Sequence, residues 1–421
     1  MQEKTENLTT EDRFSGTASK STVAQGSITA ESPAGAAARS AAARSAATQG
    51  SVVAESSAGA AVKSAAAQGI ASDLKSMTLE ELTAAMKEKG YPAFRAKQLY
   101  RWMHVSLARE YDEMTNIPKA MAAQLREQFP LTTVRMIDRQ VSKLDGTEKF
   151  LFAMRDDSLV ESVFMRYKFG NSVCISSQVG CRMGCRFCAS TLDGLYRNLT
   201  PSEMLEQIYE ITRVTGERVS HVVVMGTGEP LDNYENLVRF LRLLTDENGL
   251  NISQRNVTVS TCGIVPRIYD LAKERLSITL ALSLHAVTDE KRKKIMPIAN
   301  KYTIAELMEA GRYYFDRTGR QVTFEYSLIR DVNDSAEDAQ MLADLARPLA
   351  AHINLIPVNP VKERGYEQTR EAGVLAFKKK LEKRGINVSI RRVLGRDIDG
   401  ACGQLRHRHL AGSGPEKSPV A

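Results

Sequence analysis

Apolar positions recur with a helical period between residues 73 and 129. Thr78 precedes one such run, Glu81 follows three residues later, and Gly90 ends it. This order is typical of a helix with a capping box at its start and a glycine at its end. The pattern therefore predicts a small helical domain at this end of the folded chain.

A β-hairpin is predicted directly after these helices. Residues 139–154 place apolar positions on both sides of the dipeptide formed by Asp145 and Gly146, which is a frequent hairpin turn. We group the helices and the hairpin into one domain, residues 73–155.

Apolar runs rich in β-branched residues alternate with helical segments after residue 162. The runs cover residues 173–176, 222–225, 257–261, 278–284, 322–328, 353–358 and 388–393, and the helical segments include 201–215, 236–244, 265–275 and 304–317. Strands of this kind between helices predict a parallel sheet that is buried on both faces. The fold class is therefore α/β, and residues 156–395 form βα units that close or half close into a barrel, with the chemistry at the carboxyl ends of the strands.

The first 72 residues have a different composition from the rest. They consist largely of Ala, Ser, Gly and Thr, and the segment that begins at Ala24 returns in altered form from Thr48. Such a stretch cannot bury enough apolar surface to order itself, so we predict a disordered, duplicated tail. Its acidic residues, such as Glu3 and Glu6, argue against a transit peptide.

Composition and charge narrow the class of protein further. Of the 421 residues, 43% are hydrophobic, which is ample for a core, and no apolar run of membrane-spanning length occurs. Six cysteines in a chain of this length suit a reducing cytoplasm. Residues 361–410 contain 13 Lys and Arg against 6 Asp and Glu, a surplus equal to the net charge of +7 of the whole chain. Clustered positive charge favours a polyanionic partner over a merely solvated surface.

Three closely spaced cysteines carry the strongest chemical signal. Cys181, Cys185 and Cys188 can hold three irons of a cubic 4Fe–4S cluster and leave the fourth iron free to bind a small molecule. The alternatives are a structural zinc site, which requires a fourth ligand, or three buried thiols. The spacing resembles that of the radical S-adenosylmethionine (SAM) enzymes. This resemblance implies that SAM chelates the open iron and is cleaved to a 5′-deoxyadenosyl radical.

Polar residues close several of the other predicted strands. Gly228 and Glu229 lie in MGTGEPLDNY, and Ser260 lies near the end of the run at residues 257–261. Ser283 and His285 lie in SLHA, and Asn359 lies in LIPVNP. Glycines let a backbone approach a ligand, and Glu229 can accept a hydrogen bond from an ammonium group. A lone histidine is more often structural, but these strand ends together predict a SAM pocket.

Three residues outside these motifs are further candidates for a functional role. Cys174 lies in the strand that leads to the cluster motif, and Cys402 is flanked by glycines beyond the last strand, where a core role is hard to explain. Glu161, which we place before the first strand of the barrel, is either an exposed edge residue or a base with a raised pKa.

The motifs together resemble those of the RlmN/Cfr family of radical SAM adenine methyltransferases. The resemblance rests on SSQVGCRMGCRFCAST, MGTGEPLDNY, ALSLHA, LIPVNP and ACGQL, in family order, and covers residues 73 to 411. It implies a partial (β/α)6 radical SAM barrel, preceded by a small RNA-binding domain and followed by a C-terminal segment, residues 396–421, that carries Cys402. Thr227 stands where relatives often carry a larger apolar residue, and the tail has no family counterpart.

The resemblance also implies roles for individual residues. Cys402 is the methyl carrier, Cys174 is its disulfide partner and Glu161 accepts a proton. The residues that it assigns to SAM are Gly228, Glu229, Ser260, Ser283, Leu284, His285 and Asn359. Basic side chains such as Arg391, Arg392, Arg406 and Arg408 are expected to hold phosphates.

The implied reaction is methylation of adenine at carbon 2, with two SAM molecules per turnover and a transient protein–RNA adduct. The implied substrates are the peptidyl-transferase region of 23S rRNA and the adenine 3′ of the tRNA anticodon. We further expect a flavodoxin-like electron donor, a monomer and a cytoplasmic location without membrane attachment.

Three other functions remain open from the sequence. The Cfr branch of the family methylates carbon 8 and gives antibiotic resistance. A radical SAM enzyme that inserts sulfur into tRNA usually needs an auxiliary cluster, for which too few cysteines remain grouped. A non-enzymatic RNA-binding protein with a structural metal is the third alternative.

Overall fold

The computed structural model describes residues 73–361, 363–392, 394–398, 402–410 and 412. The predicted tail, residues 1–72, lies outside this part of the chain. A short 3-10 helix, η1 (Leu74–Ser76), begins the described chain and is followed by three α-helices: α2 (Leu79–Glu88), α3 (Ala93–His104) and α4 (Lys119–Gln128). The capping box of α2 is confirmed, because the side chain of Thr78 accepts from the Glu81 backbone and Glu81 accepts from the Thr78 backbone.

A ten-stranded sheet forms the centre of the structure, in the order β1-β2-β3-β4-β7-β8-β9-β10-β11-β12. Its strands are β1 (Arg135–Val141), β2 (Glu148–Ala153), β3 (Leu159–Tyr167), β4 (Gly170–Cys174), β7 (His221–Val224), β8 (Val257–Thr261), β9 (Thr279–Ser283), β10 (Val322–Leu328), β11 (His352–Pro357) and β12 (Val388–Ile390). From β4 to β12 every pairing is parallel, and from β1 to β4 every pairing is antiparallel. The predicted hairpin is therefore the pair β1–β2.

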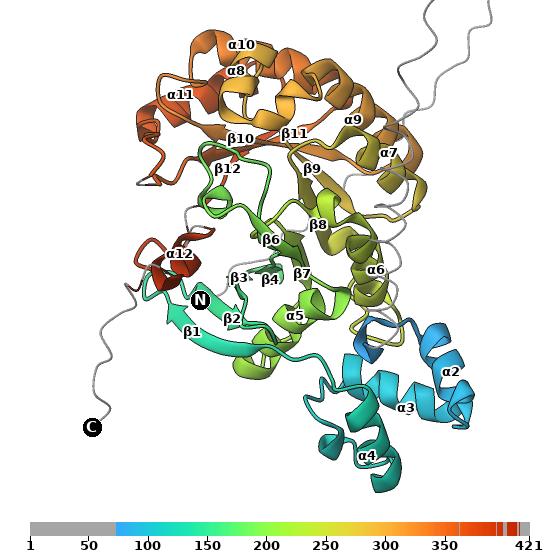
Figure 1. Cartoon of the computed structure of the whole chain (residues 1–421). Helices are drawn as coiled ribbons and strands as arrows, with labels where there is room; N and C mark the ends of the chain where they lie inside the picture. Colours follow the sequence, from blue (N-terminus) through green and yellow to red (C-terminus); the bar gives the residue numbers. More distant parts are fainter. Residues whose placement is uncertain (1–72, 362, 393, 399–401, 411, 413–421) are drawn as a thin grey trace, which may run out of the picture. The chain divides into compact units, whose positions relative to one another are not determined.

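Helices connect the parallel strands and cover their outer face (Figure 1). They are α5 (Pro201–Thr215), α6 (Tyr234–Thr245), α7 (Val265–Lys273), α8 (Asp289–Ile295), α9 (Ile304–Thr318), α10 (Ala336–Ala346) and α11 (Glu371–Glu382). They provide six strand-to-strand crossovers between β4 and β12. No pairing closes the sheet among the described strands, so the predicted partial (β/α)6 barrel is confirmed.

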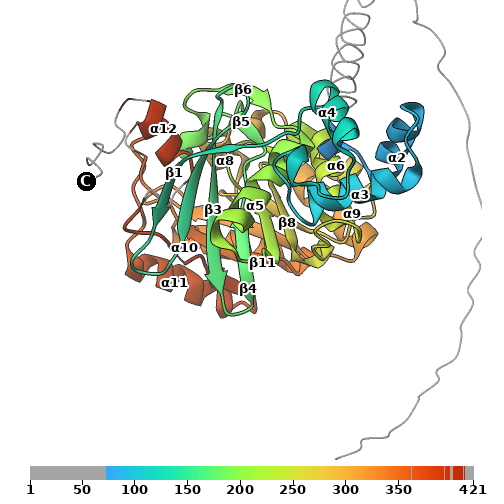
Figure 2. The same ribbon diagram turned by 90° about the horizontal axis from the view of Figure 1, so that it is seen from below.

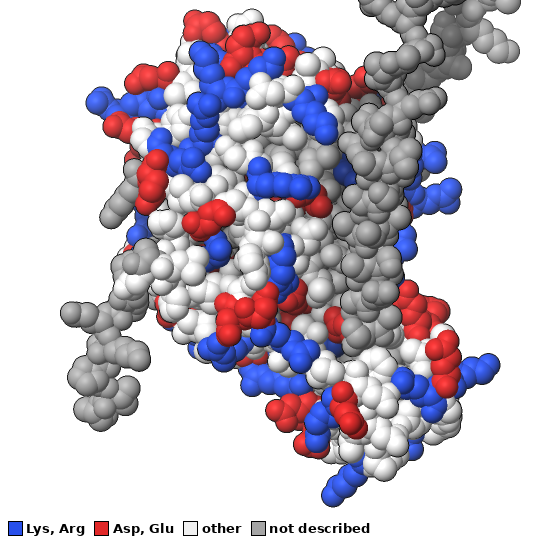
Figure 3. All heavy atoms as spheres, viewed as in Figure 1, with Lys and Arg blue, Asp and Glu red and all other residues white. Residues whose placement is uncertain are grey.

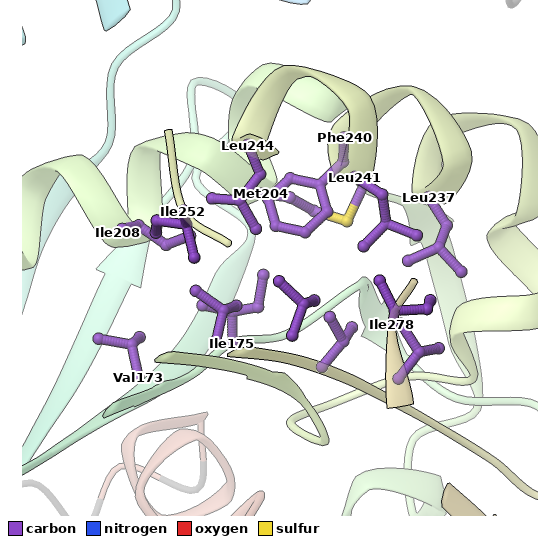
Figure 4. Close-up of a cluster of buried hydrophobic side chains, with 14 of the residues drawn as sticks. Val173, Ile175, Met204, Ile208, Leu237, Phe240, Leu241, Leu244, Ile252 and Ile278 are labelled. Atoms are coloured by element: carbon purple, nitrogen blue, oxygen red, sulfur yellow. The ribbon is translucent and has the colours of Figure 1, made fainter. Parts of the chain in front are cut away.

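The core lies between the sheet and these helices. Figure 4 shows one part of it, where side chains of α5 and α6, such as Ile208 and Phe240, face Val173 and Ile175 from the sheet side. All four are fully buried. Apolar burial of this kind is the main contribution to stability, at about 25 cal/mol per Å² of surface removed from water.

Glu161 precedes the first strand of the barrel, β4, as expected, and it lies within the antiparallel strand β3. β3 pairs with β2 on one side and with β4 on the other. The sequence pattern does not identify this segment as a strand, because a charged residue interrupts its apolar positions. Its pairing with β2 and β4 does identify it.

The N-terminal helices are fixed to the barrel by buried polar contacts. Lys75 forms an ion pair of 2.6 Å with Glu206 of α5, and neither side chain is exposed. His104 Nδ1 lies 2.7 Å from the hydroxyl of Tyr209, also on α5. Removing one partner of such a buried ion pair typically costs about 3–5 kcal/mol.

The last described helix, α12 (Gln404–Leu410), lies beside the antiparallel part of the sheet and contacts β3 (Figures 1 and 2). The helices of the described chain include none with the length and apolar character that a bilayer crossing requires.

Candidate active site

The three clustered cysteines lie in a loop between two short strands, β5 (Gln178–Gly180) and β6 (Leu195–Asn198). The backbone N–H of Cys181 donates to the carbonyl of Gly194 at 2.8 Å, which closes the base of the loop. Gly180 has a φ of +78°, and a Cβ there would lie 2.0 Å from the Gly194 oxygen. Only glycine fits this position, so the loop geometry is built into the sequence.

Hydrogen bonds also hold the far side of the loop. The Thr191 hydroxyl contacts the carbonyls of Cys185 and Cys188 at 3.1 and 3.0 Å. The backbone N–H of Arg186 donates to the carbonyl of Ile295, at the end of α8, at 2.8 Å. The loop is therefore fixed before any ligand binds.

The environment of the three thiols fits an iron–sulfur cluster. Burial raises the pKa of Cys181, Cys185 and Cys188, so a positively charged metal group is needed to hold them as thiolates. In the described part of the chain, no three His, Cys, Asp or Glu side chains converge closely enough to bind a single metal ion. The thiols instead line one wall of a common cavity, as expected for ligands to separate irons of a cluster.

This cavity, of about 250 Å³, also contains most of the residues assigned to SAM from the sequence. The predicted residues that line it are Gly228, Glu229, Ser260, Ser283, His285 and Asn359. Leu284 is fully buried and belongs to the hydrophobic core, so its side chain does not line the cavity. The parallel sheet brings these residues together because they follow the carboxyl ends of neighbouring strands.

Two glycines allow the turn after β7 to pack against the strand that leads to the cluster loop. A Cβ on Gly226 would lie 2.6 Å from the carbonyl oxygen of Ile175. A Cβ on Gly228 would lie 2.8 Å from the backbone nitrogen of Gln178, and the φ of Gly228 is +112°. The glycines therefore set the shape of the cavity wall.

Glu229 and Arg292 hold the backbone of Cys262, at the cavity, through its N–H and its carbonyl. Glu229 Oε2 accepts from the backbone N–H of Cys262 at 2.7 Å, and Arg292 donates to the carbonyl of Cys262 at 2.6 Å. Burial raises the pKa of Glu229, although backbone hydrogen bonds oppose this effect. These hydrogen bonds fix the backbone of Cys262, whose side chain is buried and lines the cavity.

His285 is fixed as a neutral ring. Its Nδ1 accepts from the backbone N–H of Ser327 at 2.9 Å, and the ring packs against Phe187 of the cluster loop with centroids 4.9 Å apart. Burial, together with the positive charge of Arg292, lowers the pKa of His285 to about 3. The ring of His285 at the cavity is therefore neutral.

The structure brings Cys174 and Cys402 together although 228 positions separate them. A hydrogen bond from Cys174, followed by the charges of Lys149 and Arg391, lowers the pKa of Cys402 below its ordinary value. The hydrogen bond to Cys402 and burial raise the pKa of Cys174. Both residues are free thiols here, as are the other four cysteines. Cys402 also lines the cavity of the three cluster cysteines, so it can reach a ligand bound there.

Glu161 is buried next to this thiol pair. Its carboxylate forms an ion pair of 2.9 Å with Lys149, and both side chains are at most 4% exposed. Of the two alternatives that the sequence left open for Glu161, the structure excludes the exposed edge residue.

A second, larger cavity of about 930 Å³ lies against the same two sulfurs. Cys174 and Cys402 both line it, together with Arg370, Arg391, Arg392 and Arg396. Within the described residues, the guanidinium groups of Arg370, Arg392 and Arg396 form no ion pair. Arg406, in contrast, forms one with Asp193 at 3.2 Å. Of the arginines expected to hold phosphates, Arg391 and Arg392 are thus placed at a cavity.

Two charged residues at the site were not predicted from the sequence. Lys149 is fully buried beside Glu161, and Glu325 lines the first cavity. A charged residue inside an otherwise apolar strand was the available signal in both cases, as it was for Glu161.

Comparisons with known proteins agree with this geometry. A family model of the radical SAM superfamily matches residues 175–345, and a model of a ribosomal RNA large subunit methyltransferase N-terminal domain matches residues 72–131. The second model covers the three N-terminal helices.

The chain is similar over most of its length to curated proteins named "probable dual-specificity RNA methyltransferase RlmN". One, from Lachnospira eligens, is 60% identical over 339 residues, which cover 80% of this chain and 97% of the relative. Another, from Clostridium botulinum (strain Alaska E43), is 54% identical over 333 residues, which cover 79% of this chain and 96% of the relative.

A solved structure shows the same architecture. It is a radical SAM methyltransferase from Sphaerobacter thermophilus, with a TM-score of 0.76 and 42% sequence identity. The match covers 79% of this chain and 98% of that structure.

Proposed function

Because this chain belongs to the RlmN family of radical SAM RNA methyltransferases, we propose that it methylates carbon 2 of adenine in two RNAs. The substrates are an adenine in the peptidyl-transferase region of 23S rRNA and the adenine 3′ of the tRNA anticodon. The names of the relatives support an RNA substrate and dual specificity.

In this proposal, Cys181, Cys185 and Cys188 hold a 4Fe–4S cluster and the residues around the first cavity hold SAM. Together these groups supply a 5′-deoxyadenosyl radical when bound. Glu229, Ser260, Ser283, His285 and Asn359 orient SAM, and the backbone at Gly228 and Leu284 completes the pocket.

Cys402 accepts the methyl group in the first half of the reaction. Its thiolate forms a sulfur–carbon bond to the methyl carbon, and the sulfonium of the donor leaves as a thioether. The hydrogen bond from Cys174 supports this role, because it favours the thiolate of Cys402. A second SAM molecule is then consumed in the radical step.

The second half of the reaction joins enzyme and RNA briefly. A hydrogen atom passes from the methyl group on Cys402 to the 5′-deoxyadenosyl radical, and the resulting carbon radical adds to the adenine ring. The adduct then loses one electron, which a cluster held by Cys181, Cys185 and Cys188 would accept. Glu161 accepts the ring proton. Cys174 then attacks the Cys402 sulfur, so that the sulfur–sulfur bond forms as the sulfur–carbon bond to the product breaks. The released carbon keeps the electron pair of that bond and takes up a proton to become the methyl group. An external thiol reductant restores both thiols.

The adenine must leave its base stack to reach Cys402. We assign the phosphates of the substrate to the arginines of the second cavity. We also propose an external flavodoxin-like electron donor, a monomer and a cytoplasmic location. The proposed domain limits are residues 1–72, 73–155, 156–395 and 396–421.

One observation carries this proposal most directly: Cys402 lies against Cys174 and also lines the cavity of the three cluster cysteines. Peptide mass analysis after incubation of the reconstituted holoenzyme with SAM, without RNA, tests the carrier role. A methyl group on Cys402 is expected, and the Cys402→Ala protein should lose RNA methylation while SAM cleavage continues. RNA methylation by the Cys402→Ala protein would contradict the carrier role.

A further inference from the structure

Both oxygens of the Glu161 carboxylate are occupied by the segment that carries Cys402. The backbone N–H of Gly403 donates to Oε2 at 2.6 Å, and the backbone N–H of Arg406 donates to Oε1 at 2.6 Å. Lys149 contacts Oε2 as well, at 2.9 Å. Because Gly403 directly follows Cys402, these bonds fix the backbone next to the reactive sulfur.

Gly403 provides a second contact with the active site. A Cβ at this position would lie 3.0 Å from the backbone nitrogen of Ser190 and 3.1 Å from the Cβ of Ala189, directly after the cluster loop. The φ of Gly403 is +80°, which a side chain also disfavours. The absence of a side chain therefore lets the Cys402 segment approach the cluster loop closely.

We propose that Glu161 is a positioning residue that docks the Cys402 segment between Cys174 and the cluster loop. This role is distinct from proton acceptance and rests on the assignment of Cys402 as the methyl carrier. A charged acceptor satisfies two backbone N–H groups that would otherwise be left without a partner. Lys149 holds the carboxylate in place from the other side.

The docking role of Glu161 and its role as proton acceptor oppose each other. The three donors occupy three of the roughly four lone-pair sites of the carboxylate, so a ring proton must compete with these hydrogen bonds. Once protonated, Glu161 lacks the negative charge that holds the segment, so proton transfer itself weakens the docking.

The test uses the reconstituted holoenzyme in its reduced form and without RNA, so that proton acceptance plays no part. Diamide serves as the two-electron oxidant that joins Cys174 to Cys402, and iodoacetamide measures the accessibility of Cys402. Both reactions are followed by peptide mass analysis over time. The variants are Glu161→Ala, which removes the acceptor, and Gly403→Ala, which leaves Glu161 and Lys149 intact but disturbs the close approach.

In both variants, disulfide formation should slow by about tenfold or more, and alkylation of Cys402 should accelerate by a similar factor. The reason is that the free energy of one hydrogen bond to a charged group is larger than the free energy of a tenfold change in an equilibrium. Leu410→Ala, in the same segment but on an exposed residue, is the control and should match the parent. Circular dichroism confirms that each variant is folded.

Parental rates of both reactions in Glu161→Ala and in Gly403→Ala would overturn the proposal. Glu161 would then act only on the substrate. The outcome is independent of the proposed function, because RNA methylation by the parent enzyme is measured separately and is not needed for either thiol reaction.

Discussion

At the scale of single residues, the site depends on the ionisation of its cysteine thiols. Desolvation raises the pKa of the three clustered cysteines, whereas Cys402 has a lowered pKa. The same residue type therefore ionises at different pH in the two places, because each side chain has different neighbours.

Methylation of Cys402 should depend on pH in a way that Cys174 controls. Because the folded protein lowers the pKa of Cys402, its thiolate persists at neutral pH and is lost as the pH falls through the lowered value. In Cys174→Ala the stabilising hydrogen bond is lost, so the midpoint of the profile should move upward by about one pH unit or more. Initial rates of Cys402 methylation without RNA, measured across pH, give both midpoints, and identical profiles would contradict this explanation.

The Cys174→Ala protein should also accumulate a covalent protein–RNA adduct. Cys174 is hydrogen-bonded to Cys402, so its removal takes away the thiol proposed to break the sulfur–carbon bond to the product. Denaturing gel electrophoresis with labelled RNA detects the adduct as a band that nuclease removes. Full turnover by this variant is the result that would disprove the assignment.

At the scale of elements, the turn after β7 shows how backbone geometry builds the cavity. Gly228 combines a positive φ with close contact to Gln178, and Glu229 follows it into the cavity. A side chain at Gly228 must therefore displace either this turn or the strand that leads to the cluster loop.

Gly228→Ala should destabilise the protein by about 3 kcal/mol and abolish SAM binding, since both strain and overlap act at this position. Gly249→Ala is the matched control. A Cβ there would lie 3.5 Å from the Cβ of His104, an ordinary contact, so the expected change is within about 1 kcal/mol. Thermal unfolding and SAM calorimetry measure the two effects, and normal SAM binding by Gly228→Ala would refute the role of this turn.

The parallel part of the sheet could be predicted from the sequence because each element carries its own signal. The run at residues 322–328 matches β10, and the helical pattern at residues 201–215 matches α5. β3 could not be predicted in the same way, since Glu161 interrupts its pattern and only the neighbouring strands and Lys149 account for its burial.

At the scale of the whole molecule, the fold gathers several arginines at one cavity, although basic residues also occur over the surface. On the face in Figure 3, Lys and Arg are interspersed with Asp and Glu. The basic surplus seen in the sequence instead contributes several arginines to the second cavity, beside Cys174 and Cys402. The sequence indicated this charge, but the cavity itself exists only after β3 and β12 approach from distant parts of the chain.

Binding of RNA should therefore become less sensitive to salt when a cavity arginine is removed. Arg392→Gln should weaken binding of both RNAs to a similar extent and lower the slope of log affinity against log salt by about one, as expected for the loss of one phosphate contact. Arg242→Gln is the control, because Arg242 already forms an ion pair of 2.6 Å with Glu274. Affinities measured at several salt concentrations give the slopes. An unchanged slope for Arg392→Gln would show that Arg392 does not contact a phosphate.

Sequence patterns also could not predict the contacts between segments that lie far apart in the chain. Nothing in the local sequence pairs Lys75 with Glu206 or Glu161 with Gly403, because burial and partner choice depend on the assembled fold. For the same reason, the juxtaposition of Cys174 and Cys402 came from family resemblance and not from their spacing.

The most direct test of the account is analysis of the methylated nucleoside. The protein is reconstituted with iron and sulfide under anaerobic conditions, supplied with SAM and a reductant, and incubated with 23S rRNA fragments and with tRNA. Mass spectrometry of the digested RNA should show 2-methyladenosine from both substrates. The appearance of 8-methyladenosine as the sole product, or of unmodified adenosine despite a full complement of cluster, would contradict it.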